Sequence, residues 1–175
     1  MVVKDVEKLI VDVPDFPKKG IIFKNITPIL FDPEVFNFTI LKMLELVEGL
    51  EFDYILGIDA RGFLFASCLA MKLKKGLALC RKKGKLPGKV ISQSYSYEYA
   101  QNELEIEADK IIKEKKYLIV DDVLATGNTC IAAAKVIRAG RGIVENVLFF
   151  GEIEFLKGRE SLSEANLQTI SFLKL

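Results

Sequence analysis

The stretch KKYLIVDDVLATGNTCIAAAKVIRAG (residues 115–140) decides the fold class of this chain. It opens on a short apolar run ending in Asp121 and Asp122, which predicts a buried strand over residues 115–123. A turn of small residues follows, and then an alanine-rich apolar segment closing on glycine, which predicts a helix over residues 129–140. A buried strand that passes directly into a helix is the unit from which parallel sheets are built.

The same alternation runs outward from this stretch in both directions. Short apolar or alternating segments predict strands at residues 53–58, 76–82, 91–99, 104–109, 144–154 and 167–173. Periodic apolar segments predict helices at residues 33–49 and 61–73. The polar, glycine-rich residues 82–89 are expected to form a long surface loop. We therefore predict an α/β protein with a doubly wound, mainly parallel sheet flanked by helices.

The N-terminal residues do not share this alternation. Apolar residues at helical spacing in VKDVEKLIVDV (residues 3–13) predict a short helix. Two prolines and a glycine make residues 14–20 a loop, and residues 21–30 carry apolar side chains at extended or loop spacing. We expect this N-terminal segment to form a cap over one end of the sheet.

The composition of the chain excludes several classes of protein. A length of 175 residues suits one domain with a single core. The 25 basic and 24 acidic residues balance, whereas a general nucleic-acid binder would show a basic excess, so we expect no nucleic-acid partner. The chain shows no signal-peptide pattern and no apolar run near the roughly 20 residues of a membrane span. We therefore expect a cytoplasmic protein with no membrane partner.

Histidine is absent from the sequence, which removes His-based catalytic triads, His general bases and HExxH metal sites. Acid–base work near neutral pH therefore falls to carboxylates, Lys, Tyr, Cys or the substrate itself. The cysteines, Cys68, Cys80 and Cys130, lack CxxC spacing and sit in apolar stretches. We expect them to be buried free thiols in a reducing compartment.

The turn after the central predicted strand has the composition of a phosphate-binding loop. Small residues let backbone amides approach an anion, the next helix adds unpaired amides and a favourable dipole, and Thr126 and Thr129 add hydroxyls. Asp121 and Asp122 would accept hydrogen bonds from sugar hydroxyls if a divalent cation screened their charge. Taken alone, these residues leave two interpretations open: a site for phosphorylated ribose, or an acidic cap in an ordinary strand–helix loop. A Walker A loop is excluded because no GK[ST] tail is present.

Beyond this turn, the sequence resembles the adenine phosphoribosyltransferases. VDDVLATGNT (residues 120–129) is similar to the family's motif for 5-phosphoribosyl diphosphate. Further blocks are similar to family blocks and stand in family order along nearly the whole chain: PDFPKKGIIFKNITPIL, GIDARGFLF, RKKGKLPG, SYSYEYAQNELEI and LKGRESL. The resemblance implies the type I phosphoribosyltransferase fold as a single domain over residues 1–175. Within it we expect an N-terminal hood (about 1–32), a core (about 33–175) and a flexible loop (about 82–100).

The resemblance also implies an activity, a cofactor and an assembly. A member of this family transfers 5-phosphoribose from 5-phosphoribosyl 1-diphosphate to N9 of adenine, giving AMP and pyrophosphate in purine salvage. Mg²⁺ is the implied cofactor, held mainly by the substrate, and a contact through water to Asp121 or Asp122 stays open. The implied assembly is a homodimer.

Binding roles follow residue by residue from the matching blocks. The expected 5-phosphoribosyl-diphosphate site comprises Asp59, Ala60, Arg61, Arg81, Lys82, Lys85, Asp121, Asp122, Ala125, Thr126, Gly127, Asn128 and Thr129. The expected adenine site comprises Ile22, Phe23, Lys24 and Val123. Arg61 stands at a helix N-terminus, where the dipole disfavours a cation, which favours ligand binding over a plain surface arginine. Local sequence favours Phe23 as a core side chain, and the resemblance makes it the ring that stacks on adenine.

Glu98 is the expected general acid/base, acting at N7 of adenine. The resemblance implies this role, and an exposed strand carboxylate is the alternative. Relatives that use hypoxanthine or guanine usually carry an Asp in the phosphate loop near N7. Here that position is Ala125, so another group must handle the proton. Because the chain has no histidine, Glu98 is the best candidate.

Three positions depart from the usual family pattern: Asn25 stands where Asp is common, and Asn128 and Ala100 stand where Gly is usual. Asn tolerates a left-handed backbone better than most residues, so the phosphate loop is expected to survive Asn128. The rival functions are a related phosphoribosyltransferase for hypoxanthine or guanine, and a non-catalytic regulator that senses 5-phosphoribosyl diphosphate. Ala125 argues against the first rival, while Glu98 and the basic loop argue against the second.

Overall fold

A computed structural model of the chain describes residues 2–97 and 100–175. The chain forms two compact units, Met1–Glu45 and Leu46–Leu175. Helix α3 belongs almost wholly to the first unit, which therefore extends beyond residue 32. The expected division into hood, core and flexible loop within a single domain stays a prediction. No helix in the described part of the chain has the length and apolar character needed to cross a membrane.

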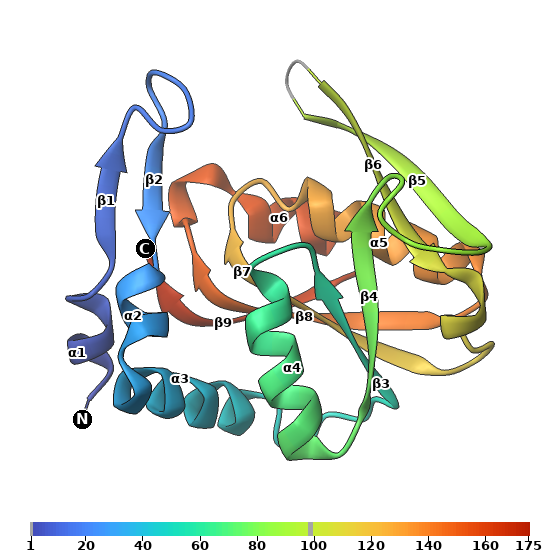
Figure 1. Ribbon diagram of the computed structural model, residues 1–175, viewed down its shortest axis with the longest axis horizontal. Coiled ribbons are helices and arrows are strands. Elements are labelled where there is room, and N and C mark those ends of the chain that lie inside the picture. Colours follow the sequence, from blue (N-terminus) through green and yellow to red (C-terminus); the bar gives the residue numbers. More distant parts are fainter. Residues whose placement is uncertain (1, 98–99) are drawn as a thin grey trace. The chain divides into compact units, whose positions relative to one another are not determined.

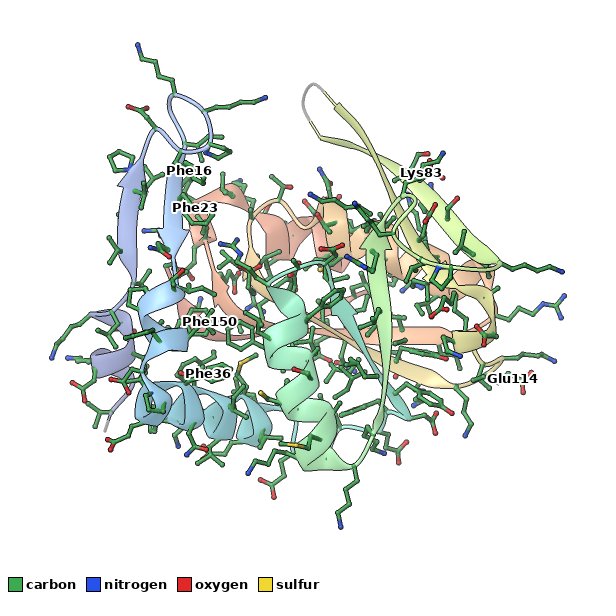
Figure 2. All side chains as sticks on the ribbon, viewed as in Figure 1. Phe16, Phe23, Phe36, Lys83, Glu114 and Phe150 are labelled. Carbon is green, nitrogen blue, oxygen red and sulfur yellow. The ribbon has the colours of Figure 1, made fainter. Side chains whose placement is uncertain are left out.

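The N-terminal unit joins a short antiparallel strand pair to helices (Figure 1). Its elements are α1 (Val3–Glu7), β1 (Val11–Pro14), β2 (Ile22–Asn25), α2 (Thr27–Phe31) and α3 (Pro33–Leu46). Val13 of β1 lies opposite Phe23 of β2. The ring of Phe16 meets that of Phe23 edge to face, with 5.2 Å between the ring centroids (Figure 2). The strand pair thus carries its own small aromatic cluster.

Two expectations for this unit are wrong. Residues 11–13, predicted as helix, belong to β1, because the alternating VDVP segment pairs with β2 along its length. Residues 27–30, predicted as extended or loop, lie in α2, whose first turn accommodates Pro28. The side chain of Asn25 accepts the amide of Thr27 at 3.0 Å just before this helix, a contact that Asp could also make.

The C-terminal unit is built on a sheet with the order β5-β6-β4-β3-β7-β8-β9 among the described residues (Figure 1). Its strands are β3 (Tyr54–Ile58), β4 (Gly76–Lys82), β5 (Val90–Tyr97), β6 (Ala100–Glu107), β7 (Lys116–Leu124), β8 (Ile143–Glu152) and β9 (Gln168–Lys174). Strands β4, β3, β7, β8 and β9 run parallel, and β6 and β5 continue the sheet antiparallel. The predicted doubly wound, mainly parallel sheet is confirmed.

Helices cover both faces of this sheet. They are α4 (Gly62–Leu73), α5 (Asn128–Ala139) and α6 (Gly158–Glu164), with short 3-10 turns η1 (Ala108–Lys110) and η2 (Glu154–Leu156). Successive side chains of β3 point to opposite faces. A carbon added to Gly57 would lie 2.9 Å from Cβ of Ala66 in α4, whereas Leu56 shares a buried cluster with Ile137 of α5. Helices α4 and α5 therefore pack on opposite faces.

The parallel strands reverse their order between β3 and β7. After β3 the chain adds β4 on one side, and it later returns to add β7 on the other side of β3. The segments that leave the carboxyl ends of β3 and β7 therefore run to opposite sides of the sheet. Such a switch point leaves a crevice in which ligands of open α/β sheets bind.

The segment between β4 and β6 is tied to the sheet edge. Strand β5 pairs with β6 from Val90 to Tyr97, within the range expected to form the flexible loop. Before it lies Lys83 (Figure 2), whose amide donates to the carbonyl of Glu103 at 3.0 Å. The ammonium of Lys83 also pairs with the carboxylate of Glu103 at 2.7 Å. Lys83 is thus an exposed side chain with a local partner.

Candidate active site

A cavity of about 510 Å³ opens at the carboxyl ends of β3 and β7, at the switch point. Its walls are formed by Ile58, Asp59, Ala60, Arg61, Lys82, Asp121, Asp122, Val123, Leu124, Ala125, Thr126, Gly127, Thr129, Cys130 and Phe149. Residues 59–61 and 121–129 are far apart in the sequence. They meet here because β3 and β7 are hydrogen-bonded neighbours running in the same direction.

The turn between β7 and α5 is open toward an anion. Gly127 has a φ of +83°, a left-handed backbone that glycine adopts without strain. No side chain in the described residues caps α5, so the helix presents its first amides and the positive end of its dipole to the cavity. Asn128 is the first residue of α5 and has no positive φ. The left-handed position is Gly127, so the departure at Asn128 places no strain on the turn.

The two acids at the end of β7 have different surroundings. Asp122 is buried, and its Oδ2 lies 2.5 Å from Nε of Arg61. Oδ1 of Asp121 accepts the amide of Asp122 at 2.9 Å, while Oδ2 lies 3.9 Å from the thiol sulfur of Cys130. Burial, and then the charge of Asp122, raise the pKa of Asp121 well above its usual range. The pair concentrates negative charge that a cation or hydrogen-bond donors on a ligand would stabilise.

The loop after β3 packs closely against these acids. Arg61 ends this loop as the N-terminal cap residue of α4 and faces Asp122. Gly62 follows, and a carbon added there would lie 2.8 Å from the carbonyl oxygen of Val120 and 2.9 Å from Oδ1 of Asp121. Only glycine lets α4 begin so close to β7. This close approach brings the guanidinium of Arg61 to the cavity wall.

The basic residues at the end of β4 divide into two kinds. Lys82 lines the cavity. Arg81 instead donates from Nε to Oδ2 of Asp59 at 3.1 Å and from Nη1 to the carbonyl of Lys85 at 3.2 Å. Arg81 therefore ties the loop after β3 to the loop after β4. Lys85 takes part in this contact through its backbone.

Several predicted residues do not line this cavity. Ile22, Phe23 and Lys24 lie on β2 in the N-terminal unit, where Lys24 pairs with Asp12 at 2.8 Å. Glu98 lies outside the described residues. Conversely, Ile58, Leu124, Cys130 and Phe149 line the cavity although no sequence pattern predicted a role for them. Ile58 and Leu124 end their strands, Cys130 lies in the first turn of α5 and Phe149 lies within β8. An apolar side chain at such a position gives no sequence pattern that separates a cavity wall from the core.

The oxygen donors beside the cavity suit a hard cation such as Mg²⁺. Among the described residues, no group of three or more His, Cys, Asp or Glu side chains gathers to hold a metal by itself. Mg²⁺ commonly keeps several waters and binds through one or two carboxylates together with substrate phosphates. Asp121 and Asp122 therefore fit an ion that arrives with a phosphorylated substrate.

Two acids and an uncapped helix N-terminus at the switch point of a doubly wound sheet indicate the class of phosphoribosyltransferases. Residues 39–149 match the family model described as the phosphoribosyl transferase domain. The adenine phosphoribosyltransferase of Caldanaerobacter subterraneus is 44% identical over 174 residues, which cover 99% of both chains. That of Thermosipho melanesiensis is 47% identical over 163 residues, covering 93% of both.

Solved structures give the same relationship. The crystal structure of adenine phosphoribosyltransferase from Thermoanaerobacter pseudethanolicus has a TM-score of 0.96 at 42% identity, covering 99% of this chain and 100% of that one. The enzyme of Saccharomyces cerevisiae, complexed with an imino-altritol bisphosphate and adenine, has a TM-score of 0.87 at 33% identity over 96% of both chains. The chain belongs to the adenine phosphoribosyltransferase family.

Proposed function

We propose that the chain transfers the 5-phosphoribosyl group of 5-phosphoribosyl 1-diphosphate to N9 of adenine, forming AMP and releasing pyrophosphate. The observation that carries this proposal is that one cavity joins the open N-terminus of α5, the Asp121–Asp122 pair and the cations of Arg61 and Lys82. The substrate offers a phosphate, ribose hydroxyls and a diphosphate, which match these three groups. The relatives' name supplies adenine as the acceptor.

The 5-phosphate binds at the turn of residues 125–129. Backbone amides of the first turn of α5 and the hydroxyls of Thr126 and Thr129 donate to its oxygens, and the helix dipole adds a favourable field. The absence of a side-chain cap among the described residues leaves this helix end available to the ligand. Asp121 and Asp122 accept hydrogen bonds from the ribose hydroxyls, which compensates charge that is otherwise poorly solvated.

The diphosphate binds on the opposite wall. Arg61 and Lys82 contact it directly, while Arg81 holds Asp59 and the backbone at Lys85 in place. Arg61 lies against Asp122 in this structure, so the diphosphate competes for its guanidinium. When the guanidinium moves from Asp122 to the diphosphate, it places positive charge at the leaving group, where negative charge develops in the transition state.

Mg²⁺ bound with the diphosphate would neutralise part of the leaving group's charge. Asp121 or Asp122 would contact the ion through water. The electron pair of N9 forms the new bond to C1 of the ribose as the bond from C1 to the diphosphate oxygen breaks. Pyrophosphate leaves with the electron pair of the broken bond between C1 and oxygen. The chain's own contribution is to hold both ends of the sugar phosphate so that this displacement is aligned.

The base is bound by Ile22, Phe23 and Lys24 of the N-terminal unit. The ring of Phe23 stacks on the purine, and backbone groups of the neighbouring residues read its edge. Adenine reacts with its ring proton on N7, and the carboxylate of Glu98 accepts that proton as N9 forms its bond to C1. We propose further that the chain acts as a homodimer in purine salvage.

A single set of assays tests the reaction. The protein is mixed with Mg²⁺, 5-phosphoribosyl diphosphate and one base at a time, and nucleotide and pyrophosphate are measured. We expect AMP from adenine and no nucleotide from hypoxanthine or guanine. Activity confined to hypoxanthine or guanine, or pyrophosphate released with no nucleotide formed, would contradict the proposal.

Replacing Glu98 tests the proton transfer. Glu98→Ala is expected to lower kcat by about 10²- to 10⁴-fold, because the variant lacks the group that moves the N7 proton. Affinity for ribose 5-phosphate should not change, since that ligand has no base. Near-wild-type turnover by a folded Glu98→Ala protein would show that another group carries the proton.

A further inference from the structure

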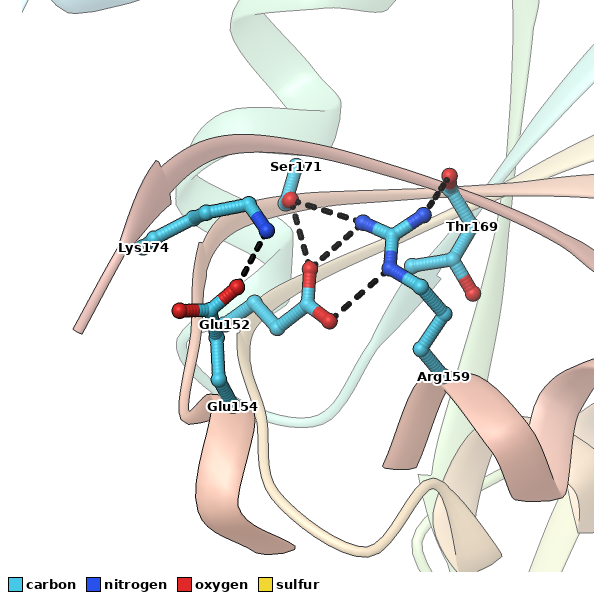
Figure 3. A network of polar contacts seen from close by, with 6 residues as sticks. All are labelled: Glu152, Glu154, Arg159, Thr169, Ser171 and Lys174. Carbon is cyan, nitrogen blue, oxygen red and sulfur yellow. Dashed lines mark hydrogen bonds and ion pairs between the residues drawn. The ribbon is translucent and has the colours of Figure 1, made fainter. Parts of the chain in front are cut away.

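Glu152 is a buried carboxylate at the end of β8, and the proposed function gives it no role. Its side chain is only 5% exposed. A carboxylate in such a position must be paired, because an isolated buried charge is costly. Arg159, the second residue of α6, supplies the partner (Figure 3).

The guanidinium of Arg159 binds the carboxylate of Glu152 through two parallel hydrogen bonds. Its Nε donates to Oε1 of Glu152 at 2.9 Å, and its Nη2 donates to Oε2 at 2.5 Å (Figure 3). Nη1 donates to the carbonyl of Thr169 at 2.8 Å, and the hydroxyl of Ser171 donates to Oε2 of Glu152 at 2.8 Å. The network therefore fastens α6 to both β8 and β9. Fork-shaped pairs of this kind fix geometry as well as charge.

The same turn of α6 touches the phosphate-binding turn through glycine. A carbon added to Gly158 would overlap the carbonyl oxygen of Ala125. A carbon added to Gly127 would lie 3.1 Å from the carbonyl oxygen of Gly158 and 3.2 Å from Cγ of the buried Leu162. The two backbones thus meet with no side chain between them. A displacement of α6 must therefore displace residues 125–127.

The ion pair is also anchored at the base of that turn. Glu152 lies opposite Leu124, the last residue of β7, in the strand register. The amide of Ile153 donates to the carbonyl of Leu124 at 2.9 Å. Glu152 is therefore fixed to the residue that immediately precedes the turn, and Arg159 is adjacent to the glycine that supports it.

We propose that Arg159 is a positioning residue for the phosphate-binding turn. Its fork onto Glu152 fixes the first turn of α6, and α6 holds residues 125–127 where the 5-phosphate of the substrate needs their amides. The inference rests on the proposed function and adds to it the contact that sets affinity for the phosphate end of the substrate.

Arg159→Lys is the variant that tests this role, because lysine keeps the charge but cannot form two parallel hydrogen bonds. Calorimetric titration compares ribose 5-phosphate, which uses the turn, with pyrophosphate, which does not. We expect the affinity for ribose 5-phosphate to fall about tenfold and that for pyrophosphate to change less than about twofold. The KM for 5-phosphoribosyl diphosphate should rise in parallel, with a smaller change in kcat.

Two further proteins complete the design. Lys174→Gln removes the exposed Lys174–Glu154 pair at the same corner (Figure 3) and is expected to leave both affinities unchanged. The double variant Arg159→Met/Glu152→Met removes both charges, so no unpaired buried carboxylate threatens folding. It should show the same selective loss of ribose 5-phosphate binding.

The outcomes separate the inference from the proposed function. Wild-type protein that fails to bind ribose 5-phosphate would overturn both. If the wild type binds it, unchanged binding by Arg159→Lys and by the double variant would overturn the positioning role alone. Equal losses for ribose 5-phosphate and pyrophosphate would also overturn it, because they would indicate a general structural defect.

Discussion

Asp121 carries an energetic cost in the folded protein that its proposed role, binding ribose hydroxyls, would explain. Burial and the neighbouring Asp122 raise its pKa, so the folded protein holds this charge at a penalty. Asp121→Asn keeps the shape and the acceptor for the amide of Asp122. We expect this variant to be more stable by about 1 kcal/mol, with a melting temperature about 2–4 °C higher.

The same substitution should weaken function. Loss of a charged acceptor for the ribose hydroxyls is expected to lower kcat/KM for 5-phosphoribosyl diphosphate by about 10- to 100-fold. Differential scanning calorimetry and steady-state kinetics on one preparation measure both effects. A variant that melts earlier and keeps full activity would contradict this account of Asp121.

Strand β7 lines the candidate active site at its carboxyl end and carries a stabilising contact at its amino end. At its amino end the buried hydroxyl of Tyr117 donates to the carbonyl of Lys110 and accepts the amide of Ile112, both at 2.8 Å. Tyr117→Phe removes both contacts and is expected to lower the free energy of unfolding by about 1–2 kcal/mol. Because the cavity lies at the carboxyl end, kcat/KM should stay within about twofold of wild type. Denaturant unfolding and kinetics test the separation, and a large loss of activity in a folded variant would refute it.

The ion pair of Arg159 and Glu152, which joins α6 to β8, should make the stability of the protein depend on pH. Hydrogen bonds from Arg159 lower the pKa of Glu152 below its ordinary value of 4.5. A carboxyl with a depressed folded pKa binds protons more weakly than in the unfolded chain. The charged carboxylate therefore contributes fully to the free energy of unfolding above its ordinary pKa of 4.5. This contribution is lost as the pH falls through the lower pKa of the folded protein.

Glu152→Gln makes this contribution measurable. At about pH 7 we expect the variant to unfold more easily by about 2 kcal/mol, since it loses charged hydrogen bonds, and near pH 4 or below we expect the difference to shrink. Glu154→Gln, at the exposed pair with Lys174, is the control and should change little at either pH. A difference that does not vary with pH would mean that the charge of Glu152 is unimportant.

Elements with long, one-sided or fully buried patterns could be predicted from the sequence. Strands β3, β4 and β7 and helix α4 lie within a residue or two of their predicted bounds, because continuous apolar runs mark strands covered on both faces. Helices α2 and α6 were missed, because so few residues give almost no periodic signal and their stability depends on packing. Strand β1 was mistaken for helix, because its pairing with β2 outweighed the local pattern.

At the scale of the whole molecule, the proposed function divides recognition of the two substrates between the two units. Phe23 and its neighbours on β2 would bind adenine, and the cavity of the C-terminal unit would bind the sugar phosphate. Phe23→Ala is expected to raise the KM for adenine by about 10- to 100-fold, since stacking on a base is worth about 1–3 kcal/mol. Affinity for ribose 5-phosphate should stay within about twofold of wild type.

Phe31→Ala provides the matched control, because Phe31 lies in the same unit and is 89% exposed. Steady-state kinetics with adenine and calorimetry with ribose 5-phosphate measure the two affinities for each variant. An unchanged KM for adenine in Phe23→Ala, or an equal loss of both affinities, would contradict the division.

The sequence located the loops of the cavity but not the contacts between them. Asp59, Arg61 and Asp122 could be assigned to one site because the ends of parallel strands meet at one edge. That Arg81 pairs with Asp59 depends on the register of β3 against β4. Register and the packing of Gly158 on the turn are properties of the folded chain that no local pattern encodes.

The thiols of Cys80 on β4 and of Cys130 on α5 are buried, Cys130 in the wall of the cavity, and burial raises the pKa of both. Oxidants and alkylating reagents attack the thiolate, which these enclosed side chains almost never form. Cys68 on α4 is the partly exposed thiol of the three. Peroxide or a maleimide should therefore modify Cys68 on α4 and leave Cys80 and Cys130 unmodified, which makes Cys68 a suitable point for attaching a reporter dye.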